Sequence, residues 1–280
     1  MLKTSRSIAV ATAILIASAS GIASAANANS VNGSILSADN NISAAFNDTN
    51  MNYQENISTM PADSETGFMP GFTLGTSFLG SVYGVNNLYA DIHYTRDSGS
   101  IAYKGSLSNG AVYDGTDNAT TNRVVARVGV AFPVASSVVL TPYVAGGYQE
   151  WSRNLAGPAG YSENYTSGLV GVGGLAQYSP MNRVVLTANA NIEALVGGGM
   201  TPSGVPGYPN GYFGSTSFKT SGEENLGVSA NYEFAPSWSV FAGLKYTHFT
   251  YTGGALLHGA AEPSSATNLF GVDTGIAYNF

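Results

Sequence analysis

Cysteine is absent from the 280 residues, and charged side chains are scarce. Without cysteine the chain can form no disulfide and can perform no thiolate chemistry. Charged residues make up 10% of the sequence, against a usual ~25% in soluble domains. The ten Lys and Arg are outnumbered by seventeen Asp and Glu. We therefore expect no nucleic-acid partner, because binding to nucleic acid depends on basic side chains that neutralise phosphates.

Long hydrophobic runs are also missing after the first 25 residues. The chain starts with Lys3 and Arg6, continues with an apolar run over residues 8–16, and reaches a small-residue motif ending at Ala25. This order predicts a cleaved secretory signal peptide over residues 1–25. The apolar run is too short for a transmembrane helix, which needs ~20 residues. Removal of Lys3 and Arg6 leaves eight basic and seventeen acidic residues, a net charge of −9.

Beyond the signal peptide, a polar stretch and then a series of alternating segments follow. Residues 26–40 are small and rich in Asn, and we expect a flexible periplasmic leader there. Residues 268–280 show the alternation most clearly, with apolar and aromatic residues on one face and small or polar residues on the other. A period of two is typical of a β-strand. An apolar face suits either the core of a sandwich or the lipid side of an outer-membrane barrel.

Charged side chains within the alternating segments all fall on the face opposite the apolar residues. In residues 123–132, for example, Arg123 and Arg127 alternate with Val124, Ala126 and Val128. This arrangement favours a barrel, because Arg or Lys on a lipid face costs ~2–4 kcal/mol near the midplane. Buried charges need partners, so we expect a paired network in the lumen. Its members are Asp91, His93, Arg123, Arg127, Glu193, Glu233, Lys245 and Asp273.

Aromatic residues recur near the ends of the apolar faces, where a membrane barrel carries its interfacial girdles. The predicted interface aromatics are Tyr94, Phe132, Tyr148, Tyr178, Phe234, Trp238, Tyr246, Tyr278 and Phe280.

Short turns alternate with long polar segments along the chain. We expect turns at residues 84–87, 133–137, 179–182 and 235–238, and extracellular loops at residues 97–122, 153–164, 197–222 and 252–267. This asymmetry is typical of an outer-membrane barrel. Eight strands lie between residues 88 and 280, and residues 68–79 and 41–55 are two further candidates. Residues 41–55 alternate poorly, and Met51 and Tyr53 suggest a bulge or an early loop.

The predicted fold is therefore an all-β, antiparallel, up-and-down transmembrane barrel spanning residues 41–280. Strand numbers in bacterial barrels are even, so if residues 68–79 form a strand, residues 41–55 must form another. We predict ten strands. The alternative is eight strands with an N-terminal extension.

The chain resembles small bacterial outer-membrane barrels of the OmpA/OmpX-like superfamily, without a periplasmic OmpA-type domain. The resemblance is carried by the signal peptide and by residues 65–71, 141–147 and 278–280. It implies a Gram-negative outer-membrane location, contact with membrane lipid and lipopolysaccharide, and recognition of Tyr278 and Phe280 by the barrel-assembly machinery.

Function is less determined than fold. We predict an envelope structural or surface-interaction protein, with extracellular ligands bound through the loops. A narrow porin-like channel for ions or small solutes is one alternative. A rim hydrolase using His248 with Asp97, Asp114 or Asp117 is another, but no catalytic motif surrounds these residues. We therefore expect no enzyme, no cofactor and no metal.

Overall fold

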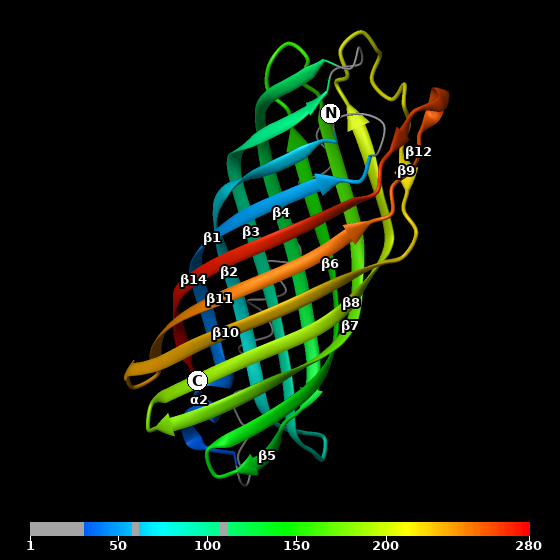
Figure 1. Ribbon diagram of the computed structural model, residues 1–280. Helices are drawn as coiled ribbons and strands as arrows, with labels where there is room; N and C mark the ends of the chain where they lie inside the picture. Colours follow the sequence, from blue (N-terminus) through cyan, green and yellow to red (C-terminus); the bar gives the residue numbers. More distant parts are fainter. Residues whose placement is uncertain (1–30, 58–61, 107–110) are drawn as a thin grey trace.

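Ten long antiparallel strands close into a barrel (Figure 1). The computed structural model describes residues 31–57, 62–106 and 111–280, so the predicted signal peptide lies outside the described residues. The ten strands are β1 (Asn41–Glu55), β2 (Ser64–Val82), β3 (Val85–Ser106), β4 (Val112–Val130), β6 (Val138–Asn154), β7 (Ser162–Met181), β8 (Val184–Ser203), β10 (Ser221–Ala235), β11 (Trp238–Tyr251) and β14 (Ser265–Asn279). The short elements are α2 (Gly33–Asp39), β5 (Phe132–Ala135), β9 (Thr216–Ser217), β12 (Gly254–Ala255), η2 (Leu257–Gly259) and β13 (Ala261–Glu262).

The barrel closes through its first and last strands. β14 pairs with β11 on one side and with β1 on the other. The pairing of β1 with β14 runs without interruption from Asn41 opposite Asn279 to Glu55 opposite Ser265. Closure leaves no long strand with an unpaired edge, which is the condition for a sheet to stand in lipid. The ten-strand prediction is confirmed, and the eight-strand alternative is wrong.

The expected bulge or early loop in residues 41–55 is also wrong. Met51 and Tyr53 keep the inward phase of the strand and are at most 1% exposed, whereas Phe46 points outward and is 69% exposed. The apparent break in pattern arises because the apolar side chains change face along the strand. They point outward near the start of β1 and inward near its end.

Short turns gather at one end of the barrel and longer connections at the other (Figure 1). We call these the turn end and the loop end. At the turn end, Tyr83 and Gly84 form a tight β2–β3 turn with φ of 48° and 84°. At the loop end, β3 and β4 pair from Leu88–Val130 as far as Ser106–Val112. The predicted loop over residues 97–122 is therefore wrong in most of its length, because Ile101 and Tyr103 continue the alternation with inward side chains.

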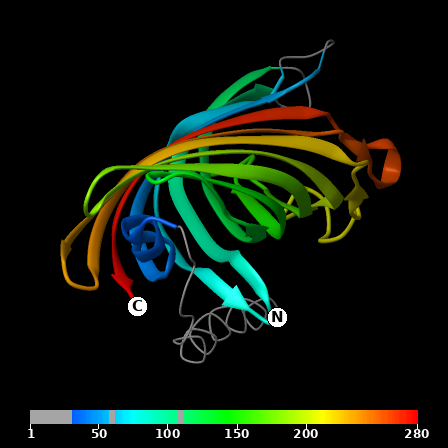
Figure 2. The same ribbon diagram turned by 90° about the horizontal axis from the view of Figure 1, so that it is seen from below.

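The predicted leader contains a helix instead of a flexible chain at residues 33–39. α2 begins after Asn32, whose side chain caps it by accepting a hydrogen bond from Ser34 N. Ile35 is fully buried, and the helix lies among the strand ends at the turn end (Figure 2). The expectation failed because one buried Ile and a capping Asn are a weak signal, whereas the barrel mouth supplies the apolar surface against which Ile35 packs.

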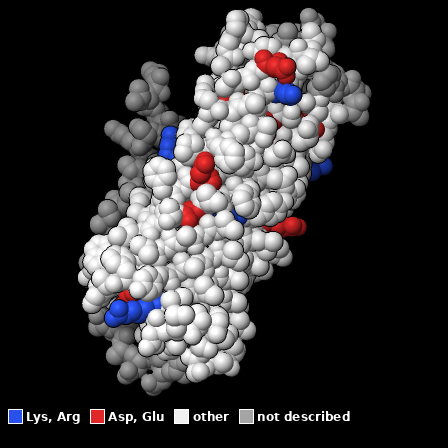
Figure 3. Space-filling view, turned by 60° about the vertical axis from the view of Figure 1, so that its left-hand side comes forward, with Lys and Arg blue, Asp and Glu red and all other residues white. Residues whose placement is uncertain are grey.

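Outward residues define a broad apolar belt. Large exposed side chains run from Trp238 and Tyr278 near the turn end to Tyr246 and Phe270 farther along the same strands. Charged side chains are few and scattered on the face seen in Figure 3. No described helix is long and apolar enough to cross a membrane.

Candidate functional site

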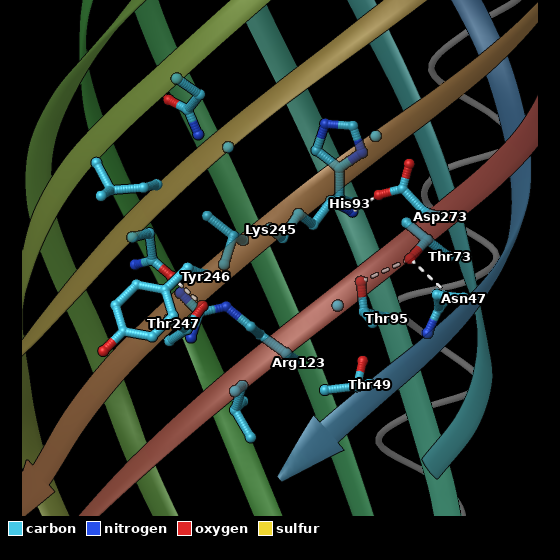
Figure 4. A pocket seen from close by; sticks show the side chains of 18 of the residues that line it. Asn47, Thr49, Thr73, His93, Thr95, Arg123, Lys245, Tyr246, Thr247 and Asp273 are labelled. Carbon is cyan, nitrogen blue, oxygen red and sulfur yellow. Dashed lines mark hydrogen bonds and ion pairs between the residues drawn. The ribbon is translucent and has the colours of Figure 1, made fainter. Parts of the chain in front are cut away.

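A cavity of about 380 Å³, with both polar and apolar lining residues, lies inside the barrel. Its lining extends from Asp39 on α2 to Trp151 and Tyr251 toward the loop end. Its wall carries Asn, Thr and charged side chains, as Figure 4 shows for one part of it. There the Thr73 hydroxyl donates to Asn47 Oδ1 at 3.2 Å and lies 3.0 Å from the Thr95 hydroxyl. We call this space the chamber.

Lys245 and Asp273 point toward each other across neighbouring strands (Figure 4), with 2.5 Å between Nζ and Oδ2. Asp91 lies between two basic side chains, 3.5 Å from Arg127 Nη1 and 3.4 Å from His93 Nε2. These contacts bring together five of the residues predicted for the lumen network. The Tyr89 hydroxyl also donates to Asp91 at 2.6 Å.

Arg123 crosses the interior from β4 to two other strands. Its Nη2 lies 2.7 Å from Glu193 Oε2 on β8 and 2.5 Å from Glu223 Oε1 on β10. The contact with Glu193 was expected, but Glu223 was missed because β10 begins earlier than predicted. Glu233 does not join this pair. It accepts a hydrogen bond of 3.0 Å from Ser37 of α2, so its expected pairing with Arg or Lys is wrong.

A second charged group, which the sequence did not reveal, lies beyond the chamber at the loop end. Arg153 is 1% exposed and forms ion pairs with Glu65 of β2 and Glu163 of β7. Its Nε donates to Glu65 Oε1 at 2.7 Å. Arg153 was assigned to a loop at residues 153–164. Its alternation with Gln149 and Trp151, all on one face, is the signal that would have placed it inside.

Aromatic rings surround this arginine. The guanidinium carbon lies 4.9 Å from the centre of the Tyr53 ring and 5.5 Å from that of Trp151. Trp151 stacks on Tyr165 at 4.9 Å, and Tyr165 stacks on Tyr251 at 5.6 Å. We call Arg153, Glu65, Glu163, Tyr53, Trp151, Tyr165 and Tyr251 the loop-end cluster. Its members come from β1, β2, β6, β7 and β11, so it spans the barrel from wall to wall.

Carboxyl groups outnumber Arg153 around the loop-end cluster, which lies beyond the apolar belt. Burial raises the pKa of Glu262 to about 9. Burial likewise raises the pKa of Glu55 to about 7, with a further increase from Asp63. The Tyr165 hydroxyl donates to Glu262 Oε1 at 2.6 Å. Protonated carboxyl groups can therefore remain buried here at neutral pH.

Most predicted interface aromatics lie on the outer surface. Eight are between 38% and 53% exposed, and they are Phe132, Tyr148, Tyr178, Phe234, Trp238, Tyr246, Tyr278 and Phe280. Tyr94 is partly buried and donates a hydrogen bond of 2.9 Å to Asn122. The rings of Trp238 and Tyr278 contact edge to face at 5.3 Å.

The residues considered for a rim hydrolase do not come together. His248 lies on the outer face of β11, where its Nδ1 is 2.9 Å from Asn268 Oδ1. Asp97 and Asp117 point inward and are 6% and 0% exposed. Asp97 contacts Asn47, and Asp117 accepts a hydrogen bond from Asn154 N. These contacts form no His–Asp pair.

The sequence matches no protein-family model and no curated protein. The structure is similar to the outer-membrane protease OmpT of Escherichia coli, with a TM-score of 0.53 and 9% identity over 86% of this chain and 97% of that chain. The translocator domain of the autotransporter NalP from Neisseria meningitidis is less similar, with a TM-score of 0.43 and 10% identity over 98% of this chain and 96% of that chain. The likeness to OmpT confirms the barrel fold predicted from the resemblance, and it extends to the fold alone.

Proposed function

We propose that this chain is a Gram-negative outer-membrane barrel, closed to solutes, that serves as an envelope structural or surface-interaction protein. The observation that carries the proposal is that side chains or a helix occupy the barrel near both ends. The loop-end cluster occupies one end and α2 occupies the other.

The apolar belt supports the membrane location. Outward side chains of the belt are aliphatic in its middle and aromatic near its borders, as expected for a barrel in a bilayer. In such barrels the short turns face the periplasm and the long connections face outside. The turn end would then be periplasmic, and the loop end, with the upper parts of β3, β4, β7 and β8, would project from the membrane.

Closure at the loop end rests on packing. Tyr53, Trp151, Arg153 and Tyr165 are each at most 3% exposed although they belong to strands on different sides of the barrel. An ion that crossed this layer would have to displace stacked rings and a paired guanidinium. A barrel of eight strands has an interior that side chains just fill, and large aromatic residues extend such filling to ten strands.

Closure at the turn end rests on the attachment of α2 to several walls. Asp39 accepts a hydrogen bond of 2.7 Å from Gln177 of β7, and Ser37 donates to Glu233 of β10. Asn40 donates to Leu79 O of β2 and accepts from Leu79 N, at 2.9 and 3.1 Å. Because hydrogen bonds attach it to β7, β10 and β2, α2 is fixed in the mouth of the barrel and acts as a plug.

Planar-bilayer recording of the purified, refolded protein tests the closure. We expect no conductance steps from the native chain, and none after deletion of residues 33–39 alone, because the loop-end cluster still seals the barrel. The same deletion combined with Tyr53→Ala, Trp151→Ala and Tyr165→Ala should conduct. Steps from the native protein would contradict the proposal and would favour the narrow channel, for which the charged chamber is the supporting observation.

Loop replacement tests the surface-interaction role. Cells that carry the chain with residues 204–214 and 255–261 replaced by Gly-Ser linkers should adhere less to surfaces and host cells than cells with the native chain. Deletion of the whole chain should weaken the envelope against detergent. Unchanged adhesion together with an unchanged envelope would contradict the role. The likeness to a protease adds no hydrolase to the proposal, because His248 lies on the outer face of β11 whereas Asp97 and Asp117 point into the barrel.

A further inference from the structure

Two connections of the loop end extend beyond β9 and β12 (Figure 1). Aromatic side chains from both connections form a cluster at their tips. The Tyr212 ring stacks on His258 with 4.0 Å between ring centres and 18° between planes. Tyr208 lies 4.8 Å from Tyr212 and 4.9 Å from Phe213. Tyr208 is 48% exposed, and Tyr212 and Phe213 are half-buried. We call these four residues the aromatic patch.

The patch is held in place by its backbone. Leu257 N donates to Phe213 O at 2.9 Å, which joins the two connections. Tyr212 N donates to Pro209 O, and Gly214 N donates to Gly211 O, each at 3.1 Å. A surface ordered before binding loses little conformational entropy when a ligand arrives.

His258 holds a left-handed backbone conformation at the tip of its connection. Its φ is 56° and its ψ is 29°, the left-handed region that non-glycine residues rarely adopt. Such strain costs of order 1 kcal/mol or more and persists where the surroundings enforce it, often at ligand sites. Here the strain places the imidazole flat against Tyr212, while the side chain stays exposed at the tip.

The chemistry of the patch limits the class of ligand. Residues 204–214 and 255–261 contain no Asp, Glu, Lys or Arg, so an ionic ligand finds no counter-charge there. Within the described chain, the Tyr208 and Tyr212 hydroxyls have no hydrogen-bond partner, and Asn210 uses only its oxygen, which accepts from Gly204 N. A purely apolar partner would cover these polar groups without pairing them, at a cost in free energy.

We propose that the aromatic patch binds an uncharged sugar ring of a glycan. A pyranose offers an apolar C–H face and hydroxyl groups around its edge. The negative face of an aromatic ring attracts C–H groups, and the Tyr hydroxyls and the Asn210 amide can pair with the sugar hydroxyls. This inference deepens the proposed surface-interaction role and depends on the loop end facing outward.

The test uses the full mature chain in phospholipid nanodiscs, since sugar-headed detergents would compete. An array of neutral, sialylated and sulfated oligosaccharides is probed, and the neutral oligosaccharide bound most strongly is titrated. We expect binding to neutral members, weakened about tenfold or more by Tyr212→Ala with His258→Ala, through loss of the stacked platform. The control is Tyr83→Ala, because Tyr83 is a fully exposed ring at the opposite end.

Several outcomes would overturn the inference. They are no binding to neutral members, stronger binding to sialylated or sulfated members, or equal weakening in the Tyr83→Ala control. Heat-modified mobility on gels verifies that each variant is folded. A chain that conducts ions but binds the sugar through the patch would overturn the proposed closure alone. A chain that shows no conductance steps and binds no neutral sugar would overturn this inference and leave the proposed closure intact.

Discussion

Arg153 Nε donates to Glu65 Oε1 at 2.7 Å across the interior of the barrel, from β6 to β2. β3 and β4 separate these strands in the sheet, so the contact joins two parts of the wall that no backbone ladder connects directly. Both side chains are 1% exposed. Glu163 adds a second carboxylate to the same guanidinium, and the three residues form a cross-link at the loop end.

Removing the cation should destabilise the barrel more than removing any exposed charge. Arg153→Ala leaves Glu65 and Glu163 buried without their partner, which costs about 3–5 kcal/mol. Urea titration of the protein in micelles, followed by tryptophan fluorescence, measures the loss. The control is Lys104→Ala, because Lys104 is exposed and should change stability by less than about 0.5 kcal/mol.

A neutral replacement of the cross-link separates charge from packing. Arg153→Met with Glu65→Gln and Glu163→Gln removes the unpaired charges while filling much of the volume, and it should recover most of the lost stability. If this triple variant is as unstable as Arg153→Ala, packing around the guanidinium and not its charge explains the loss.

Stability should fall as the pH rises. In the folded protein the pKa of Glu55 is about 7 and that of Glu262 is about 9, against 4.5 in an unfolded chain. Between these limits the folded barrel holds more protons than the unfolded chain, so the free energy of unfolding decreases with pH. Thermal midpoints in micelles should therefore be higher at about pH 5 than at about pH 9.

One substitution isolates the contribution of a single group to this slope. Glu262→Gln keeps an oxygen for the Tyr165 hydroxyl and cannot ionise, so it should flatten the fall in stability above neutral pH. Glu224→Gln, at an exposed position on β10, should leave the slope unchanged. If stability changes equally with pH in the Glu262→Gln and Glu224→Gln variants, groups other than Glu262 cause the pH dependence.

The sequence predicted the membrane zone well because lipid imposes one rule on every strand there. Apolar side chains face out and charges face in, and this rule placed Arg123, Lys245 and Asp273 on the correct face. Beyond the belt, water replaces lipid and the rule reverses. Met51, Tyr53 and Ile101 then point inward, so an argument based on lipid interpreted their strands as bulges or loops.

Alternation within single strands was also insufficient to predict the charged sites. Alternation indicates which face of a strand Arg153 would occupy, but it does not show that β6 continues as far as Asn154. The partners of Arg123 depend on the register between β8 and β10, where Glu193 lies opposite Glu223. Register is set by turns and closure together, and one strand read alone does not contain it. The plug α2 was missed because a seven-residue helix is too short to be stable without the barrel around it.

The plug should contribute measurable stability. Ile35 is fully buried, and truncating such a side chain to Ala costs about 2–5 kcal/mol. Ile35→Ala should therefore lower the urea midpoint in micelles. Val134→Ala is the control, since Val134 is 58% exposed at the same end of the barrel. An Ile35→Ala variant as stable as this control would mean that α2 rests on the mouth without contributing to folding.

Two lumen-facing glycines allow a test of how tightly the barrel interior is packed. A methyl group added at Gly173 of β7 would lie 2.5 Å from Asn191 Cβ and 2.6 Å from the Tyr143 hydroxyl oxygen. That oxygen lies 2.5 Å from Asn189 Oδ1, to which it donates, so the ring cannot move away without losing the bond. Gly173→Ala should cost about 1–3 kcal/mol through overpacking. At Gly227 of β10 the nearest atom would lie 3.6 Å away, an ordinary contact, and Gly227→Ala should change stability much less. Refolding titrations of the two variants in the same lipid vesicles compare them directly, and equal losses would show that flexibility of the backbone, and not the packing around Tyr143, sets the cost.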